Sequence, residues 1–417
     1  MGSRQLWILC AILFGLGLIS QPIQYLFPKY MEDTLSQRLW IAGLLRAIPI
    51  GLGGISALLA GSLCDRFGRK LTLVLGITGG FLVGFVFISR SAMVILVVLC
   101  MQGIASGLKS AGGQSYLIGS VKTSALGRAT AAYFLSGIFG QAVGKSAAGV
   151  LIKQYSYAAF GFGTVGLGLL LVLVTVLVLP RQQTMIPVTE PETDTDPDSE
   201  IETDSRRGFL AALWQNYAPI IGRRNVAILA GIRFFSTFSW GSIQFLMPLL
   251  MARLADIQIT GFLGGSSDIF ACLCLQVAGI ICDRTGVIKP AIGSHFLILA
   301  SLFGLMLSAH SVTGFFVAGI LASGAAWSLS TTMPRFIKRF SSDGETGRGV
   351  GFLHLAWSLG FLSGYFVASL LIGLGQQIPL ICAMVSVSVS AGLIFTLDRG
   401  PTGRNELKDC DLLTRAV

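Results

Sequence analysis

The chain has 417 residues, of which 53% are hydrophobic and only 12% are charged, and its mean hydropathy is +0.75. A soluble domain carries about 25% charged residues, so these values exclude a soluble globular protein and predict a membrane protein. The net charge of +10 would suit a protein that binds nucleic acid. Most of the Lys and Arg residues, however, lie in polar segments on one predicted side of the membrane. The charge therefore reflects membrane topology, and we expect no nucleic-acid partner.

Apolar runs long enough to cross a bilayer recur along the whole chain. A spanning helix needs about 20 mainly apolar residues. The first run continues to Phe27 without a small-residue cleavage site, so we predict a spanning helix there rather than a signal peptide. The twelve predicted helices cover residues 5–27, 38–62, 70–89, 92–117, 129–152, 158–180, 226–249, 258–281, 290–309, 313–334, 349–373 and 378–397.

A polar segment separates the sixth predicted helix from the seventh. Its centre, residues 190–204, combines acidic residues with Thr, Ser and Pro and cannot bury a core. The sequence predicts an all-α membrane protein with twelve transmembrane helices in two six-helix halves. The predicted segments are a first half at 1–180, a cytoplasmic acidic linker at 181–225, a second half at 226–400 and a cytoplasmic tail at 401–417.

Glycines that recur at a fixed interval indicate that the two halves arose by duplication. The fifth and eleventh predicted helices share one pattern at a constant interval, and a second pattern recurs at almost the same interval. The first pattern is Gly127, Gly140 and Gly144, matched by Gly347, Gly360 and Gly364; the second is Gly61, Asp65, Arg66 and Gly68, matched by Gly279, Asp283, Arg284 and Gly286.

The segment from Gly61 to Lys70 reads Gly-Ser-Leu-Cys-Asp-Arg-Phe-Gly-Arg-Lys. It resembles the signature loop of the major facilitator superfamily, Gly-x-x-x-Asp-Arg-x-Gly-Arg-Arg/Lys, between the second and third helices. The glycines let helices touch and the chain turn, and the charged residues can pair and cap neighbouring helix ends. The resemblance implies a latch on the cytoplasmic gate between the halves. The expected gating residues are Gly61, Asp65, Arg66, Gly68, Arg69 and Lys70, with Asp283 and Arg284 in the second copy.

The predicted helices contain four basic residues but one acidic residue among them, Asp268. Each such charge costs about 2.5–3.5 kcal/mol near the centre of a bilayer, and one aspartate cannot neutralise four cations. An anion that enters and leaves would resolve the imbalance. Alternatives remain for each residue: Arg46 can pair with Asp268, Arg233 can reach toward the cytoplasm, and Lys109 and Lys145 can lose their protons through desolvation.

In the fold that the resemblance implies, the first, fourth, seventh and tenth helices line a central path. Polar and aromatic side chains recur at helical spacing in the first, fourth and seventh of them. Trp327 and Trp357 fit either packing or cavity lining. The predicted substrate-binding residues are Gln21, Gln24, Arg46, Gln102, Lys109, Lys145, Arg233, Trp240 and Gln244, and Asp268 is the candidate for proton coupling.

The sequence predicts a secondary transporter that moves a small anionic solute, a carboxylate or a phosphate-bearing metabolite, by alternating access. The alternatives are a proton-coupled exporter of amphipathic drugs or lipids, and a receptor that does not transport. The sequence shows no nucleophile–base pair, metal-ligand cluster or phosphate-binding loop, so we expect no enzyme, cofactor or metal. The expected partners are membrane lipid, the solute and a coupling proton. We expect a monomer in a bacterial plasma membrane with both termini in the cytoplasm.

Overall fold

A computed structural model describes residues 2–36, 38–121, 126–180, 222–340 and 346–397. Twelve helices within these ranges are long and apolar enough to cross a membrane. This confirms the predicted helix count and fold class. Most of the predicted linker and all of the predicted tail lie outside the described residues, so both remain predictions.

The helices extend to or beyond most of the predicted ends, because polar terminal turns stay helical after the apolar run stops. The first six spans are α1 (Gly2–Asp33), α2 (Leu39–Phe67), α3 (Arg69–Leu82) with α4 (Phe85–Ile88), α5 (Ala92–Ser120), α6 (Leu126–Gln154) and α7 (Tyr157–Val178). The next six are α9 (Arg224–Leu254), α10 (Ile257–Thr285), α11 (Ile288–Leu307), α12 (Val312–Phe340), α13 (Thr346–Leu371) with the 3-10 turn η3 (Ile372–Leu374), and α14 (Gln377–Thr396).

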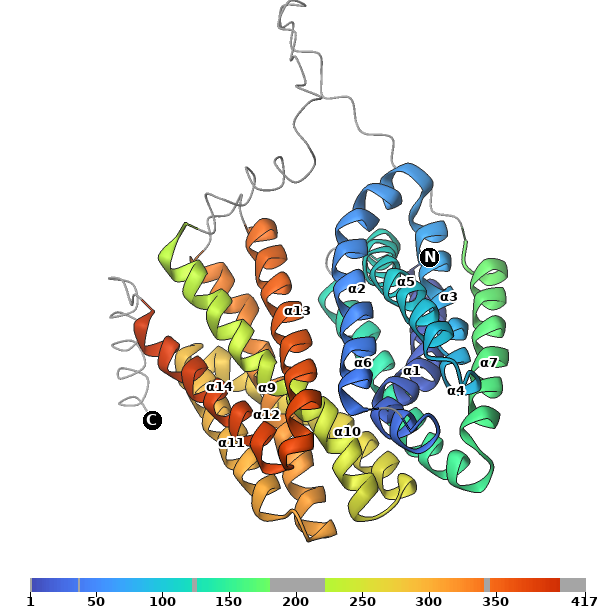
Figure 1. The fold of residues 1–417 in the computed structure, drawn as a ribbon. Coiled ribbons are helices and arrows are strands. Elements are labelled where there is room, and N and C mark those ends of the chain that lie inside the picture. The colour runs from blue at the N-terminus through green and yellow to red at the C-terminus, as the bar shows by residue number, and fades with distance from the viewer. Residues whose placement is uncertain (1, 37, 122–125, 181–221, 341–345, 398–417) are drawn as a thin grey trace, which may run out of the picture.

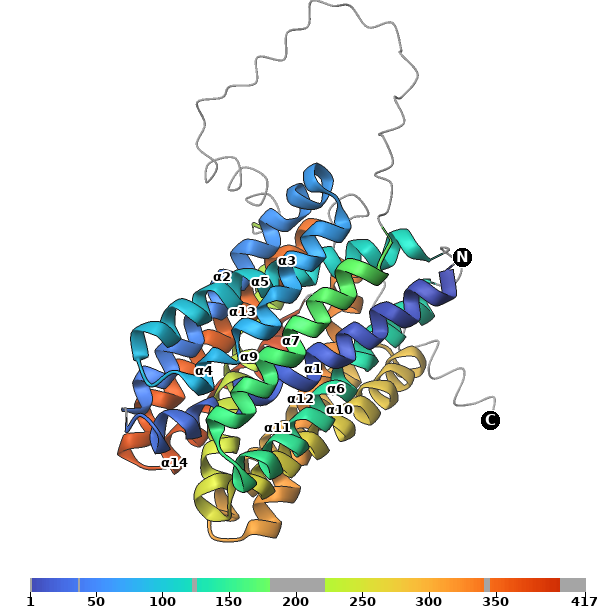
Figure 2. The ribbon, with the colours of Figure 1, turned by 90° about the vertical axis from the view of Figure 1, so that its right-hand side faces the viewer.

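Helices α1–α7 form one bundle and helices α9–α14 form another (Figure 1), and Figure 2 shows the same helices from the side. The bundles meet where α2 packs on α13, α6 on α10 and α1 on α9. We call the end at which Asp33, Gln154 and Leu254 finish their helices the closed end, because the bundles touch there. The opposite end, which carries Gly68 and Gly286, is the open end, where the bundles spread apart at the top of Figure 1.

Four glycines of the first repeated pattern lie at matching helix crossings. A Cβ atom on any of these four would overlap a backbone carbonyl oxygen of the facing helix. The facing residues recur at the same interval as the glycines, so the α1–α6 crossing of the first half is repeated as the α9–α13 crossing of the second. The pairs are Gly140 with Phe14, Gly144 with Leu18, Gly360 with Phe234, and Gly364 with Phe238.

Glycines also bring the backbones of the two halves together. A Cβ on Gly149 of α6 would lie 2.7 Å from the carbonyl oxygen of Ile257, and a Cβ on Gly261 of α10 would lie 2.5 Å from the carbonyl oxygen of Lys145. Backbone therefore packs on backbone where α6 crosses α10, near the closed end.

The two loops that resemble each other in sequence turn in the same way. Gly68 and Gly286 have φ angles of +88° and +75°, which a residue with a side chain rarely adopts. Lys70 donates to the carbonyl of Val176 at 2.7 Å, and Asp283 pairs with Arg335 of α12, so these two contacts stay within their own halves. Gly61, Asp65 and Arg66 lie in the last two turns of α2, and their side chains are outside the described part. Arg69 and Arg284 lie beside the two glycines. A gating role for all these residues remains a prediction.

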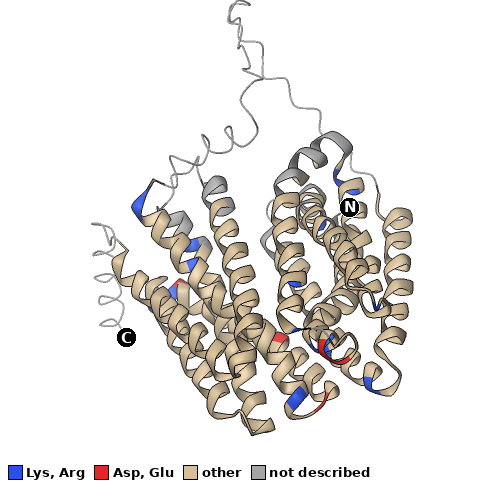
Figure 3. Cartoon of the chain, viewed as in Figure 1, with Lys and Arg blue, Asp and Glu red and all other residues tan. Residues whose placement is uncertain are grey.

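Among the residues that the structure describes, two ion pairs join the halves at the closed end, although the helices carry few charges overall (Figure 3). Arg253 Nε of α9 donates to Glu32 of α1 at 3.1 Å, and Lys153 of α6 lies 2.7 Å from Asp256. The Asp256 carboxylate also caps α10 by accepting from the Ile259 N–H at 2.8 Å. The hydrogen bond from Lys153, helped by that from Ile259, lowers the pKa of Asp256. This pair therefore persists at neutral pH and is lost only as pH falls through the lowered pKa.

Removing both pairs with Glu32→Gln and Lys153→Met is expected to increase the population opened at this end. Exposed ion pairs contribute about 0–1 kcal/mol each, so removing two of them should shift the population by up to about thirtyfold. Electron-spin distances between labels at Tyr155 and Leu374, exposed in different halves, would measure it. The control is Lys289→Gln, which removes an exposed charge at the open end; an equal shift there would contradict the prediction.

Candidate functional site

A cavity of about 580 Å³ lies between the two bundles. Its lining comes from α1, α5, α6, α10 and α12, so both halves contribute. A second pocket of about 200 Å³ lies among α9, α11, α12 and α13. Trp327 and Ser330 of α12 line both spaces. The two spaces therefore adjoin, and we call them together the central cavity.

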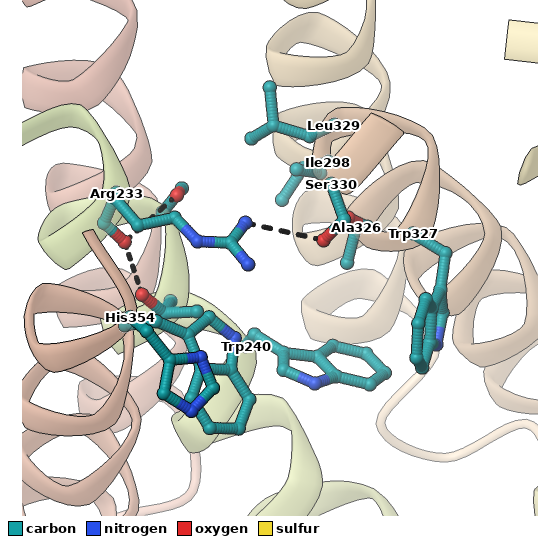
Figure 4. Close-up of a pocket in the computed structure, with 11 residues that line it drawn as sticks. Arg233, Trp240, Ile298, Ala326, Trp327, Leu329, Ser330 and His354 are labelled. Carbon is teal, nitrogen blue, oxygen red and sulfur yellow. Dashed lines mark hydrogen bonds between the residues drawn. The ribbon is translucent and has the colours of Figure 1, made fainter. Parts of the chain in front are cut away.

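Among the described residues, Lys and Arg side chains line the central cavity at two positions, and no Asp or Glu side chain lines it. Lys109 of α5 lines the larger space and Arg233 of α9 lines the smaller one. Lys109 has no hydrogen-bond or ion-pair partner among the residues that the structure describes. Arg233 reaches across the smaller pocket, where its Nη1 donates to Ser330 Oγ at 3.3 Å (Figure 4). The cavity is thus positively charged and has unused hydrogen-bond donors.

Local packing places both cations. A Cβ on Gly76 of α3 would overlap the backbone nitrogen of Lys109, so the backbone of α5 is held against α3 at this position. On α9, the hydroxyls of Ser236 and Thr237 both donate to the carbonyl of Arg233, the first at 3.2 Å. These hydroxyls donate to their own helix, so the charged donor that faces the smaller pocket is the Arg233 guanidinium.

The predicted binding residues separate into two groups. Gln21, Lys109, Arg233 and Trp240 line the central cavity, as do Ser106 and Thr237, which lie at helical spacing from Lys109 and Arg233 on the fourth and seventh predicted helices. The other predicted binding residues do not line it, and their contact with substrate remains a prediction. These are Gln24, Arg46, Gln102, Lys145 and Gln244, together with the proton-coupling candidate Asp268.

Lys145 and Asp268 form a buried ion pair that joins α6 to α10. Lys145 Nζ lies 2.8 Å from one carboxylate oxygen and 3.0 Å from the other. The same ammonium group lies 5.0 Å from the ring centre of Tyr25. Lys145 is 5% exposed and Asp268 9% exposed, so neither charge is solvated by bulk water. The partner of Asp268 is therefore Lys145.

Arg46 lies on the other interface between the halves. Its Nη2 donates to Gln24 Oε1 at 2.5 Å. On the α13 side of this interface, the buried Tyr365 hydroxyl has no hydrogen-bond partner in the described part of the chain. Lys145 and Tyr365 occupy equivalent positions in the two halves, because each directly follows a glycine of the first repeated pattern. Duplicated positions thus carry a cation in one half and a phenol in the other.

Several cavity residues were not predicted as binding residues from the sequence. Ser330 and His354 line the smaller pocket beside Trp327 and Trp357. Their signal was available: Trp327 and Ser330 are three residues apart on the tenth predicted helix, which places them on one face. A repeat in the sequence was also missed: Ile-Gln-x-Leu-x-Pro occurs at residues 23–28 and again at 243–248. This repeat makes Gln24 and Gln244 equivalent positions of the two halves, although neither lines the central cavity.

No group of His, Cys, Asp or Glu side chains within the described ranges could hold a metal ion.

Comparison with known proteins points to one family. The family model described as Major Facilitator Superfamily matches residues 7–333 and 229–410. Among solved structures, the chain is similar to a bacterial homologue of the human lysosomal transporter Spinster in an inward-facing, unoccupied conformation, with 14% identity, a TM-score of 0.73 and coverage of 98% of each chain. No curated protein sequence matches the chain.

Proposed function

Because this chain belongs to the major facilitator superfamily, we propose that it is a secondary transporter that moves a small anionic solute, a carboxylate or a phosphate-bearing metabolite. The observation that carries the proposal is the charge of the central cavity. Lys109 and Arg233 line it, and no carboxylate among its described lining residues neutralises them. Charge-assisted hydrogen bonds to carboxylate or phosphate are about twice as strong as neutral ones, so an anion would be favoured there.

Transport would proceed by alternating access. The positive-inside pattern of the loops supports a cytoplasmic open end, so the described state is inward-facing in this proposal. The anion enters from the open end and binds between the cations. The halves then rock, the closed-end ion pairs break, and the signature loops come together at the open end. Lys145 and Asp268 must separate in that motion, and a proton delivered to Asp268 would assist it.

In this proposal the protein is a monomer in a bacterial plasma membrane, and lipid surrounds its helices. Large apolar side chains remain exposed on the outer faces of the bundles, as expected for helices solvated by acyl chains. They include Phe162, Leu177, Phe296, Leu307, Val385 and Phe395.

Replacing Arg233 with Ala is expected to weaken binding and uptake of a transported anion by about tenfold to hundredfold. A hydrogen bond to a charged group contributes about 1.5–3 kcal/mol, and about 1.4 kcal/mol is a factor of ten. Arg233→Lys keeps the charge but loses the planar fork, so it should retain part of the affinity. Uptake into proteoliposomes, after ligands are chosen from a thermal-shift panel of anionic, neutral and cationic solutes, would measure both effects.

Arg224→Ala is the matched control, because Arg224 is an exposed arginine on the same helix, outside the cavity. It should leave uptake unchanged. If only neutral or cationic amphiphiles stabilise the protein, and Arg233→Ala changes none of their affinities, the anion proposal fails.

A further inference from the structure

The smaller pocket of the central cavity has an aromatic wall. Trp240, Trp327 and Trp357 line it together with His354. The His354 ring stacks on Trp357 with ring centres 5.5 Å apart and planes 14° apart. Trp357 in turn stacks on Phe361 at 5.5 Å and 28°. Because these three rings lie at helical spacing on α13, they form a continuous stack on one face of that helix.

The hydroxyl groups of the same pocket are already occupied within the protein. Ser236 and Thr237 donate to the backbone carbonyl of Arg233, and Ser330 donates to the carbonyl of Ala326 at 3.4 Å. The guanidinium of Arg233 has five N–H donors and makes one hydrogen bond to a described residue. The remaining donors are the indole N–H groups of the three tryptophans and the histidine ring, so a ligand rich in hydroxyl groups would regain only part of its water contacts here.

Arg233 is positioned to bind the charged end of a ligand while the tryptophan rings of the smaller pocket contact its apolar part. In Figure 4 its guanidinium points toward Ser330, with His354 and Trp327 on opposite sides of the pocket. Aromatic rings prefer stacked or edge-on contact with other rings, and an arginine fork matches a carboxylate. A volume of about 200 Å³ is below the range of about 300–1,000 Å³ typical of drug-sized ligands, so it suits a molecule of one or two rings.

From this arrangement we infer that the transported anion is a carboxylate carried on a flat aromatic body. The carboxylate binds Arg233 and Ser330, and the ring packs among Trp240, Trp327 and Trp357. This inference rests on the proposed function and names the substrate class within it. Lys109 lies in the larger space and attracts anions of any shape, whereas the tryptophans select among them.

The test compares benzoate with cyclohexanecarboxylate, which has the same charge and a similar size but a puckered, saturated ring. Binding to the purified full-length protein is measured by calorimetry. We expect benzoate to bind at least fivefold more tightly than its saturated counterpart. Trp327→Leu should remove that preference by weakening benzoate alone, and Trp240→Leu serves as a second variant if the first does not fold. Arg233→Ala should weaken both acids.

The control is Trp7→Leu, because Trp7 is 72% exposed on α1 and lies outside the cavity; the preference should persist in this variant. Equal binding of both acids would overturn the inference, as would a tryptophan variant that weakens both acids equally. If a sugar phosphate binds in an Arg233-dependent way while neither acid does, the inference fails and the proposed anion transport stands. If no anion binds, both fail.

Discussion

Replacing Asp268 with Asn is expected to destabilise the protein by about 3–5 kcal/mol, because it leaves the buried Lys145 without its counter-charge. Lys145 Nζ lies 2.8 Å from the carboxylate, and the described residues offer the ammonium no second acid. The nearby Tyr25 ring contributes only a cation–π contact. Thermal unfolding of the detergent-purified protein, followed by tryptophan fluorescence, would measure the loss.

The double variant Lys145→Met with Asp268→Leu separates charge from packing. Replacing both members of a buried pair by apolar residues is often neutral for stability, so the double variant should recover most of what Asp268→Asn loses. Asp283→Asn is the matched control, since the Asp283 side chain is 68% exposed in its pair with Arg335 and should cost less than about 1 kcal/mol. If the double variant is as unstable as Asp268→Asn, the loss of stability comes from altered side-chain packing and not from the unpaired charge of Lys145, which would contradict the prediction.

Gly364→Val is expected to cost more than about 3 kcal/mol and to prevent accumulation of folded protein. The added side chain would meet the carbonyl oxygen of Phe238, and α13 would have to move away from α9. Overpacking in a close-packed interior costs about 1–3 kcal/mol when side chains can yield, and here the obstacle is backbone. Gly144→Val, the equivalent change in the first half, should have a similar effect.

The matched control for both glycine variants is Gly392→Val in α14, where a Cβ meets no atom within 4 Å. Size-exclusion profiles and unfolding temperatures of the three variants would be compared. If Gly392→Val is as damaging as Gly364→Val, the loss reflects the β-branched residue in a helix and not the α9–α13 crossing.

The helix count could be predicted from the sequence because a spanning helix is a local property: about 20 apolar residues are sufficient. The repeat of the glycine pattern could also be recognised in the sequence, because Gly140 and Gly360 occupy matching places in it. What the repeat meant became clear only in three dimensions, where each glycine faces a carbonyl that is itself repeated.

The candidate site was predicted in part. Arg233, Thr237 and Trp240 line the cavity, but Gln244 does not. Helical spacing tells which side chains share a face, but not how far along the membrane normal the cavity extends. A stripe from Arg233 to Gln244 covers about three turns and continues past the end of the cavity.

The pairing of Lys145 with Asp268 could not be predicted either, because 123 residues separate them. The sequence suggested Arg46 as a partner for Asp268 and did not suggest Lys145. The packing of α6 on α10 brings Lys145 to the carboxylate instead, and that packing depends on glycines whose facing partners the sequence does not show.

Where α6 crosses α10, Gly149 and Gly261 place main chain on main chain. At these two glycines the contact involves no long side chain that must change rotamer when one helix turns on the other. In the proposed alternating access, the halves would therefore pivot at this crossing. The buried ion pair of Lys145 and Asp268 would resist that motion, so the pivot and its main restraint would lie on the same pair of helices.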